Sequence, residues 1–65
     1  MKKQHMTGQF RICEKMARDL AEEYMRDAHE YSAQRKDDLA SHSYAEARRA
    51  VERAEWYKER ANWYE

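Results

Sequence analysis

The chain has 65 residues, of which 42% are hydrophobic and 40% are charged, and its 13 basic and 13 acidic side chains cancel at pH 7. A chain of this length holds one domain at most and buries only about 60% of its unfolded surface on folding. The even charge balance leaves no basic patch of the kind that drives binding to nucleic acid or to an anionic membrane, so both are disfavoured as partners.

Aliphatic core residues are scarce. Only five residues belong to the Leu, Ile, Val and Phe set, which is far below the usual content of a globular domain. Ten alanines, a single glycine and the absence of proline nevertheless favour helix, and eight aromatic residues with four methionines supply bulk. The composition therefore predicts a folded, all-α chain that completes its core against a second copy or another partner.

The N-terminal segment Met1-Lys2-Lys3 is basic, but no apolar run follows it. It therefore resembles neither a signal peptide nor a membrane-spanning segment. We expect the protein to lie in the cytoplasm.

A first amphipathic helix is predicted over residues 8–33, with Thr7 as its N-cap. From Phe10 onward, apolar residues recur every three or four positions over six turns, which is typical of a helix with one buried face. The stripe consists of Phe10, Cys13, Ala17, Leu20, Tyr24, Ala28 and Tyr31.

A turn is predicted within residues 34–43, where the apolar periodicity is interrupted for the longest stretch. Neither Gly nor Pro enforces a stop there. A single long, bent helix is the alternative, because alanines keep a seven-residue spacing through this region at Ala33, Ala40, Ala47, Ala54 and Ala61.

The second helix is predicted at about residues 44–64. Ser43 and Glu46 form a Ser-x-x-Glu capping box, with Ser41 and Asp38 as competing caps. Small residues at Ala47, Ala54 and Ala61 predict a close approach of another helix.

A sequence repeat marks the end of this second helix, where Ala54-Glu55-Trp56-Tyr57 recurs seven residues later as Ala61-Asn62-Trp63-Tyr64. Seven residues are two helical turns, so each residue type returns to nearly the same face. Such a surface is expected to pack against something, and the shortage of aliphatic core predicts that two copies of a helical hairpin associate into a four-helix bundle. The residues expected in the self-association seam are Phe10, Cys13, Leu20, Tyr24, Tyr31, Val51, Ala54, Tyr57 and Ala61.

Both tryptophans lie on a face of their own, about 200° around the helix from the alanines. Together with Arg53 and Arg60 they form the predicted partner-binding surface, because Trp and Arg are enriched at interface hot spots. In the alternative interpretation, Trp56 and Trp63 pack over the first helix or over a dimer mate, with arginine stems laid across them.

A second functional class is a nucleic-acid accessory factor. Arg48, Arg49 and Arg53 lie near aromatic residues of the second helix, and lysines lie near the N-terminus. Five carboxylates interleaved along the same helix argue against strong binding. Titration with duplex and single-stranded DNA at two salt concentrations separates the two classes.

Catalytic, metal and cofactor chemistry has no recognisable motif in this sequence. His5, His29 and His42 have no ligand partners at helical spacing, and the His29-Glu30 pair lacks the second histidine of a zinc-binding helix. Cys13 is the single cysteine, which excludes an internal disulfide. We therefore expect a protein that is not an enzyme and that binds neither metal nor cofactor.

The general character of the chain, including its two Ala-x-Trp-Tyr segments, resembles the small helical early proteins encoded in the exo–xis region of lambdoid phages. That group is associated with the balance between lytic and lysogenic growth and with perturbation of host replication or cell-cycle control. The resemblance implies a regulatory binding protein without catalysis, and no functional residue is carried over from it.

Overall fold

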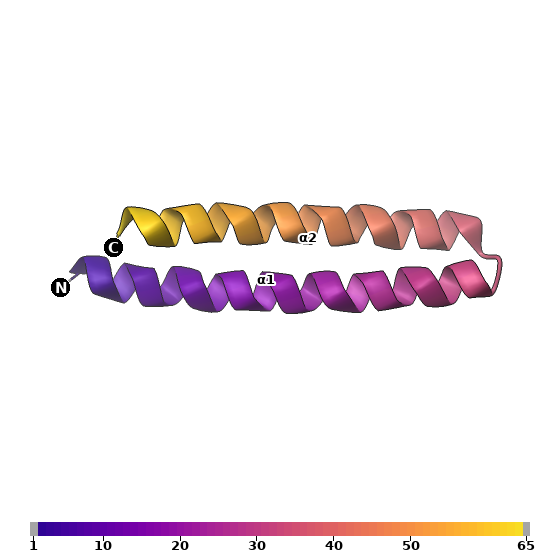
Figure 1. Cartoon of the computed structure of the whole chain (residues 1–65), viewed down its shortest axis with the longest axis horizontal. Coiled ribbons are helices and arrows are strands. Elements are labelled where there is room, and N and C mark those ends of the chain that lie inside the picture. Colours follow the sequence, from indigo (N-terminus) through magenta and orange to yellow (C-terminus); the bar gives the residue numbers. More distant parts are fainter. Residues whose placement is uncertain (1, 65) are drawn as a thin grey trace.

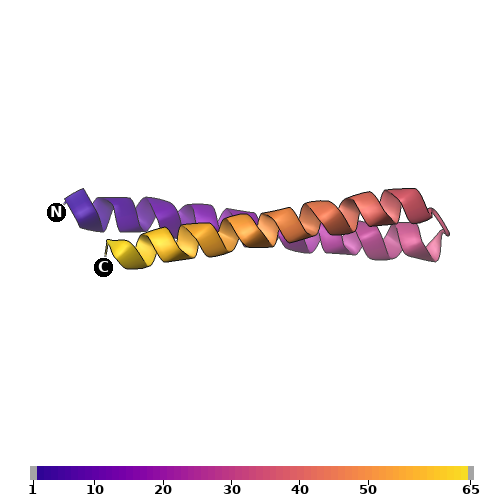
Figure 2. The same cartoon turned by 90° about the horizontal axis from the view of Figure 1, so that it is seen from above.

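The computed structural model describes the backbone of residues 2–64 and the side chains of residues 7–64. Over this range the chain forms two α-helices, α1 (Lys2–Ala33) and α2 (Asp37–Trp63), which lie side by side as an antiparallel hairpin (Figure 1). The molecule measures 51 × 12 × 10 Å, and the helices cross each other when seen from above (Figure 2). The predicted all-α helical hairpin is confirmed, and the single bent helix is excluded.

Both helices begin earlier than the sequence pattern predicted. Helix α1 starts at Lys2 rather than near residue 8, so Thr7 lies inside it and is not its N-cap. Helix α2 starts at Asp37 rather than at about residue 44, so the capping box of Ser43 and Glu46 was a wrong prediction, and Ser43 is buried inside the helix. Asp38 and Ser41, the competing caps, also lie inside α2.

Helix α2 starts without a side-chain cap. Its N-cap residue, Lys36, makes no capping side-chain hydrogen bond, whereas Asp37 and Asp38 place two carboxylates in the first turn. These negative charges favour a helix N-terminus because they oppose the helix dipole. The capping box failed as a signal because packing of the preceding turn against α1 extends the helix beyond it, and Ala40 in that turn is buried.

The contact between the helices is a seam of two heptad stripes, in which residues recur alternately three and four positions apart. All of these side chains are buried or half-buried. The seam consists of Thr7, Phe10, Glu14, Ala17, Ala21, Tyr24, Ala28 and Tyr31 from α1, and Ala40, Ser43, Ala47, Ala50, Ala54, Tyr57 and Ala61 from α2, followed by its C-cap residue Tyr64.

Alanine dominates this seam. Ala28, Ala54 and Ala61 have no exposed surface, and among residues 7–64 no large side chain is fully buried. Alanine allows two helix backbones to approach closely, but each buried CH₂-sized group contributes only about 0.8 kcal/mol. The hairpin is therefore packed closely while burying little apolar surface.

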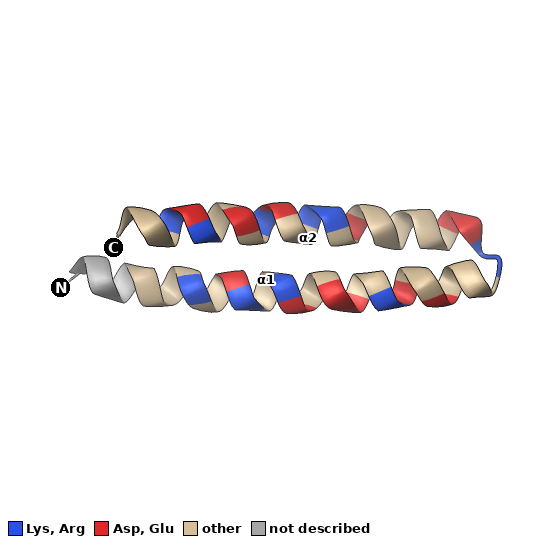
Figure 3. Ribbon diagram, viewed as in Figure 1, with Lys and Arg blue, Asp and Glu red and all other residues tan. Residues whose placement is uncertain are grey.

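An ion-pair network joins the helices beside the seam. The guanidinium of Arg18 lies 3.0 Å from a Glu14 carboxylate oxygen and 3.4 Å from a Glu55 oxygen on α2. The hydrogen bond to Glu14 is the largest of the contributions that raise the pKa of Arg18, with Glu55 adding to it and burial opposing it. Elsewhere, acidic and basic residues are interspersed along both helices, apart from residues 39–45 of α2, which include none (Figure 3). Exposed pairs of this kind contribute little stability, so their main effect is to orient side chains.

The connection between the helices is a three-residue turn at residues 34–36. The backbone N–H of Lys36 donates to the carbonyl of Tyr31 (2.9 Å), and that of Arg35 donates to the carbonyl of Ser32 (3.0 Å). These two bonds form a Schellman motif, which terminates a helix with one left-handed residue. That residue is Arg35, with φ of 61°, where glycine is the usual choice.

Arg35→Gly is expected to raise the free energy of unfolding by roughly 0.5–1 kcal/mol, because glycine removes the Cβ strain of the left-handed conformation. Urea denaturation followed by circular dichroism measures the change. Ser32→Gly is the matched control: it places glycine in right-handed helix three residues earlier and is expected to lower stability by about the same amount. A loss of stability in Arg35→Gly would contradict the turn geometry.

Ala54→Leu is expected to lower the free energy of unfolding by about 1–3 kcal/mol, because Ala54 has no exposed surface and three added heavy atoms overpack the seam. Ala33→Leu is the control, since Ala33 keeps the same seven-residue spacing but is exposed. Equal stability of the two variants, measured by urea denaturation, would show that residue 54 does not lie in a close helix contact.

Candidate functional site

Several large apolar side chains of this hairpin lie outside the seam and are exposed. Met16 is 66% exposed, Trp56 48% and Trp63 71%. Each of these three side chains comes two residues after a residue of the seam. Because they share this offset in an antiparallel hairpin, helical geometry places them on the same side of the seam. We call this surface the Trp56 face; it consists of Cys13, Met16 and Leu20 from α1, and Arg53, Trp56, Tyr57, Arg60 and Trp63 from α2.

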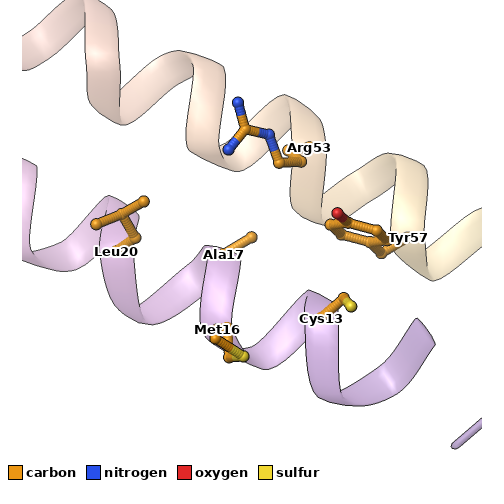
Figure 4. Close-up of a pocket in the computed structure, with 6 residues that line it drawn as sticks. All are labelled: Cys13, Met16, Ala17, Leu20, Arg53 and Tyr57. Atoms are coloured by element: carbon orange, nitrogen blue, oxygen red, sulfur yellow. The ribbon is translucent and has the colours of Figure 1, made fainter. Parts of the chain in front are cut away.

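A groove of about 300 Å³ runs along the Trp56 face between the two helices. Figure 4 shows Cys13, Ala17 and Leu20 rising from α1 on one side of it, with Arg53 and Tyr57 coming from α2 on the other. Met16 also lines the groove and lies farther from α2. Ala17, which belongs to the seam, forms the floor of the groove. The groove exists because the seam residues are small.

An aromatic cluster fixes the orientation of Trp56. Its ring lies edge-on to Phe10 of α1, with centroids 6.1 Å apart, and edge-on to Tyr57, at 5.4 Å. Phe10 in turn stacks on Tyr64 near the end of α2, at 5.7 Å. Edge-to-face and offset-stacked arrangements at these distances are the favourable geometries for aromatic pairs. Trp56 is therefore both half-exposed and held in place.

Arg60 connects the two tryptophans. Its guanidinium carbon lies 4.9 Å from the ring centroid of Trp56 and 4.4 Å from that of Trp63. Both distances are within the range of a cation–π interaction. The seven-residue repeat places the indoles two turns apart, and Arg60, one turn from each, lies between them.

The Trp56 face is basic. Within residues 52–60 of α2, the side chains beside the seam on this face are Arg53 and Arg60. The carboxylates of the same residues lie elsewhere. Glu55 pairs with Arg18 on the opposite side of the seam, while Glu52 and Glu59 lie on the outer side of α2. Among the described side chains Arg53 has no hydrogen bond and no ion pair. One uncompensated guanidinium therefore borders the apolar groove.

The opposite side of the seam has a different character. A groove of about 510 Å³ is lined there by Arg18, Ala21, Glu22, Met25, Arg26 and Val51. We call it the Val51 face. Only Met25 and Val51 supply exposed apolar bulk, at 38% and 42%, and both signs of charge are present.

The nine residues expected to associate with a second copy do not share one surface. Ala54 and Ala61 are fully buried in the seam of the chain itself, where Phe10, Tyr24, Tyr31 and Tyr57 are half-buried. Cys13 and Leu20 lie on the Trp56 face, and Val51 lies on the Val51 face. The four residues expected to bind a partner, Arg53, Trp56, Arg60 and Trp63, do lie together.

One contributor to the Trp56 face, Met16, was not identified as a site candidate from the sequence. It is 66% exposed and extends the apolar surface along α1, whereas Ile12, 59% exposed, lies on the outer side of α1, away from the seam. The signal that points to Met16 is the phase of the heptad: once Glu14 and Ala21 are placed in the seam, Met16 must project beside the groove.

Metal and membrane sites have no counterpart in the described part of the chain. Residues 7–64 hold no cluster of three or more His, Cys, Asp or Glu side chains suited to a metal ion. Neither helix, over its described residues, combines the length and apolar character needed to cross a bilayer.

Comparison with known proteins gives no relative: no family model matches the chain, and no match was found among curated proteins or solved structures.

Trp56→Ala is expected to lower the free energy of unfolding by about 1 kcal/mol or more, because it removes two aromatic contacts. Trp63→Ala is expected to change it by less than about 0.5 kcal/mol, as for other exposed sites. Urea denaturation provides both values.

In the single-tryptophan variants Trp56→Phe and Trp63→Phe, iodide should quench Trp63 more strongly than Trp56. The reverse order would contradict the packing of Trp56.

Proposed function

We propose that this chain is a small, non-enzymatic regulatory protein of the cytoplasm that acts by binding another protein through the Trp56 face. The observation that carries this proposal is the array of Trp56, Arg60 and Trp63 beside an open apolar groove. Tryptophan and arginine are the residue types most enriched at binding hot spots. Because the guanidinium already holds both indoles, little side-chain freedom remains to be lost when a partner binds.

Self-association is a second part of the proposal, and the small core supports it. Among residues 7–64 no large side chain is fully buried, while Met25 and Val51 are 38% and 42% exposed. A chain with so little core gains stability by burying apolar surface against a second copy. We propose that a second copy covers the Val51 face, where both signs of charge allow a two-fold arrangement to bring opposite charges together.

If the chain pairs with itself, its melting temperature is expected to rise with protein concentration, because mass action stabilises the folded dimer. Circular dichroism melts over a hundredfold concentration range, combined with sedimentation equilibrium, measure this dependence. Val51→Lys is expected to shift the equilibrium toward monomer. A constant melting temperature and a monomer mass would contradict self-association.

Binding of DNA is the alternative, and the arrangement of the arginines weakens it. Arg48 projects on the side of the seam opposite Arg53, and Arg49 is paired with Glu46. The three arginines therefore form no continuous basic stripe along α2. Contacts with phosphates that release counterions need such a stripe.

The resemblance to small proteins of the lambdoid exo–xis region extends this proposal to a biological setting. In that setting the partner belongs to the host or to the phage, and its binding modulates development or host replication. The shared features are the size, the charge balance and the aromatic, alanine-rich helices.

The proposal is tested by affinity capture with the full chain from lysate of the cells that produce it, followed by identification of the captured protein and by a binding assay with that protein in purified form. Trp63→Ala combined with Arg60→Ala is expected to abolish binding while helix content is kept. Leu39→Ala is the control, because Leu39 is 46% exposed at the other end of the hairpin. Equal binding by both variants, or salt-sensitive binding to DNA without a protein partner, would overturn the proposal.

A further inference from the structure

The groove on the Trp56 face is open, has a volume of about 300 Å³ and lies between α1 and α2. Its walls, Cys13 to Leu20 on α1 and Arg53 to Tyr57 on α2, run parallel to the long axis of the hairpin. A helix placed there would contact both α1 and α2 and form a three-helix bundle. Exposed side chains of Met16 and Trp56 flank the position that it would occupy.

The charges around this groove favour an acidic occupant. Arg53 lines the groove, and Arg60, seven residues farther along α2, lies about 10 Å beyond Arg53 on the same side of the helix. Arg53 has no ion pair among the described side chains, and the guanidinium of Arg60 is held by aromatic rings rather than by a carboxylate. Both positive charges are therefore available to a partner that carries carboxylates.

A second copy of the chain fits this groove poorly. A two-fold arrangement of one Trp56 face on another would bring arginines of both copies together. The carboxylates within residues 52–60 of α2 lie on other sides of the helix and would not separate these arginines. The acidic part of the same side of α1, at Glu23, Asp27 and Glu30, offers no apolar side chain to fill the groove. Like charges facing each other at an interface cost binding energy.

We propose that this groove binds an amphipathic helix of another protein that carries acidic residues seven positions apart along the edge of its apolar face. The apolar residues pack on Cys13, Leu20 and Tyr57, and the two carboxylates pair with Arg53 and Arg60. This inference rests on the proposed function, since it specifies the chemistry of the partner that the Trp56 face recognises. Helix-in-groove recognition with apolar residues at i, i+3 or i+4, and i+7 is a recurring mode of protein binding.

Two synthetic peptides test the charge requirement with the wild-type chain. Both are amphipathic helices of about 18 residues, about 27 Å long, with the same leucine stripe; one carries Glu and the other Lys at two edge positions seven residues apart. Binding is measured with the wild-type chain by calorimetry, and tryptophan fluorescence provides a second readout of the same titration. The Glu peptide is expected to bind at least tenfold more tightly, with a preference that falls as salt increases.

Charge reversal in the protein tests the two arginines directly. The double variant Arg53→Glu, Arg60→Glu is expected to reverse the preference, so that the Lys peptide binds more tightly than the Glu peptide. Arg48→Glu combined with Lys36→Glu is the matched control, because it reverses the same number of charges away from the groove and is expected to keep the preference for the Glu peptide. Should the first variant lose its helix content, Arg53→Gln with Arg60→Gln is used instead and is expected to remove the preference.

Equal affinity for both peptides, or an absence of binding at millimolar peptide, would overturn the acidic-helix inference. Loss of dimer in the Arg53, Arg60 variant would also overturn it, because the groove would then belong to a second copy. The proposed function fails separately: if Trp63→Ala with Arg60→Ala still binds the captured partner, the Trp56 face is not the binding surface at all. If the captured partner requires the Trp56 face but the two peptides bind equally well, the proposed function stands and only the acidic-helix inference is refuted.

Discussion

The close packing of alanines between the two helices is the constraint on which the rest of the structure depends. Ala54 and Ala61 have no exposed surface, and none of the large side chains among residues 7–64 is fully buried. A seam of methyl groups brings the helix backbones close together and leaves no space for tryptophan, methionine or leucine between them. These residues must therefore lie on the sides of the hairpin, where another molecule can cover them.

Because these large side chains lie beside the seam, the two sides of the hairpin differ. On the Trp56 face, aromatic contacts with Phe10 and the cation–π contacts of Arg60 give the exposed indoles a defined arrangement. On the Val51 face, two apolar residues lie among charges of both signs. The first pattern favours a partner with complementary chemistry, and the second is compatible with an identical copy. In the proposed function, the Val51 face serves self-association and the Trp56 face serves recognition of a partner.

The hairpin, the small-residue contact and the grouping of the four partner-binding candidates could be predicted from periodicity and the seven-residue repeat. The rotation of α1 about its axis, which decides which of its residues face α2, could not be predicted. Two stripes with nearly the same spacing share Phe10, Ala17 and Tyr24; one continues through Cys13 and Leu20, the other through Glu14 and Ala21. Hydrophobicity favours the first, but the structure uses the second, because alanine fits the narrow seam and Glu14 is paired with Arg18. Helix starts were missed for a related reason, since packing of Ala40 and Ser43 outweighs local capping signals.

The phase of α1 determines whether the Trp56 face exists, and NMR measures it directly. In the proposed arrangement the methyl group of Ala21 gives strong intramolecular NOEs to alanine methyl groups of α2, and the methyl groups of Leu20 give only weak ones. Mixing labelled and unlabelled chains separates these signals from contacts between copies. Strong intramolecular NOEs from Leu20 to α2, together with none from Ala21, would rotate α1 about its axis, close the groove and contradict the arrangement described above.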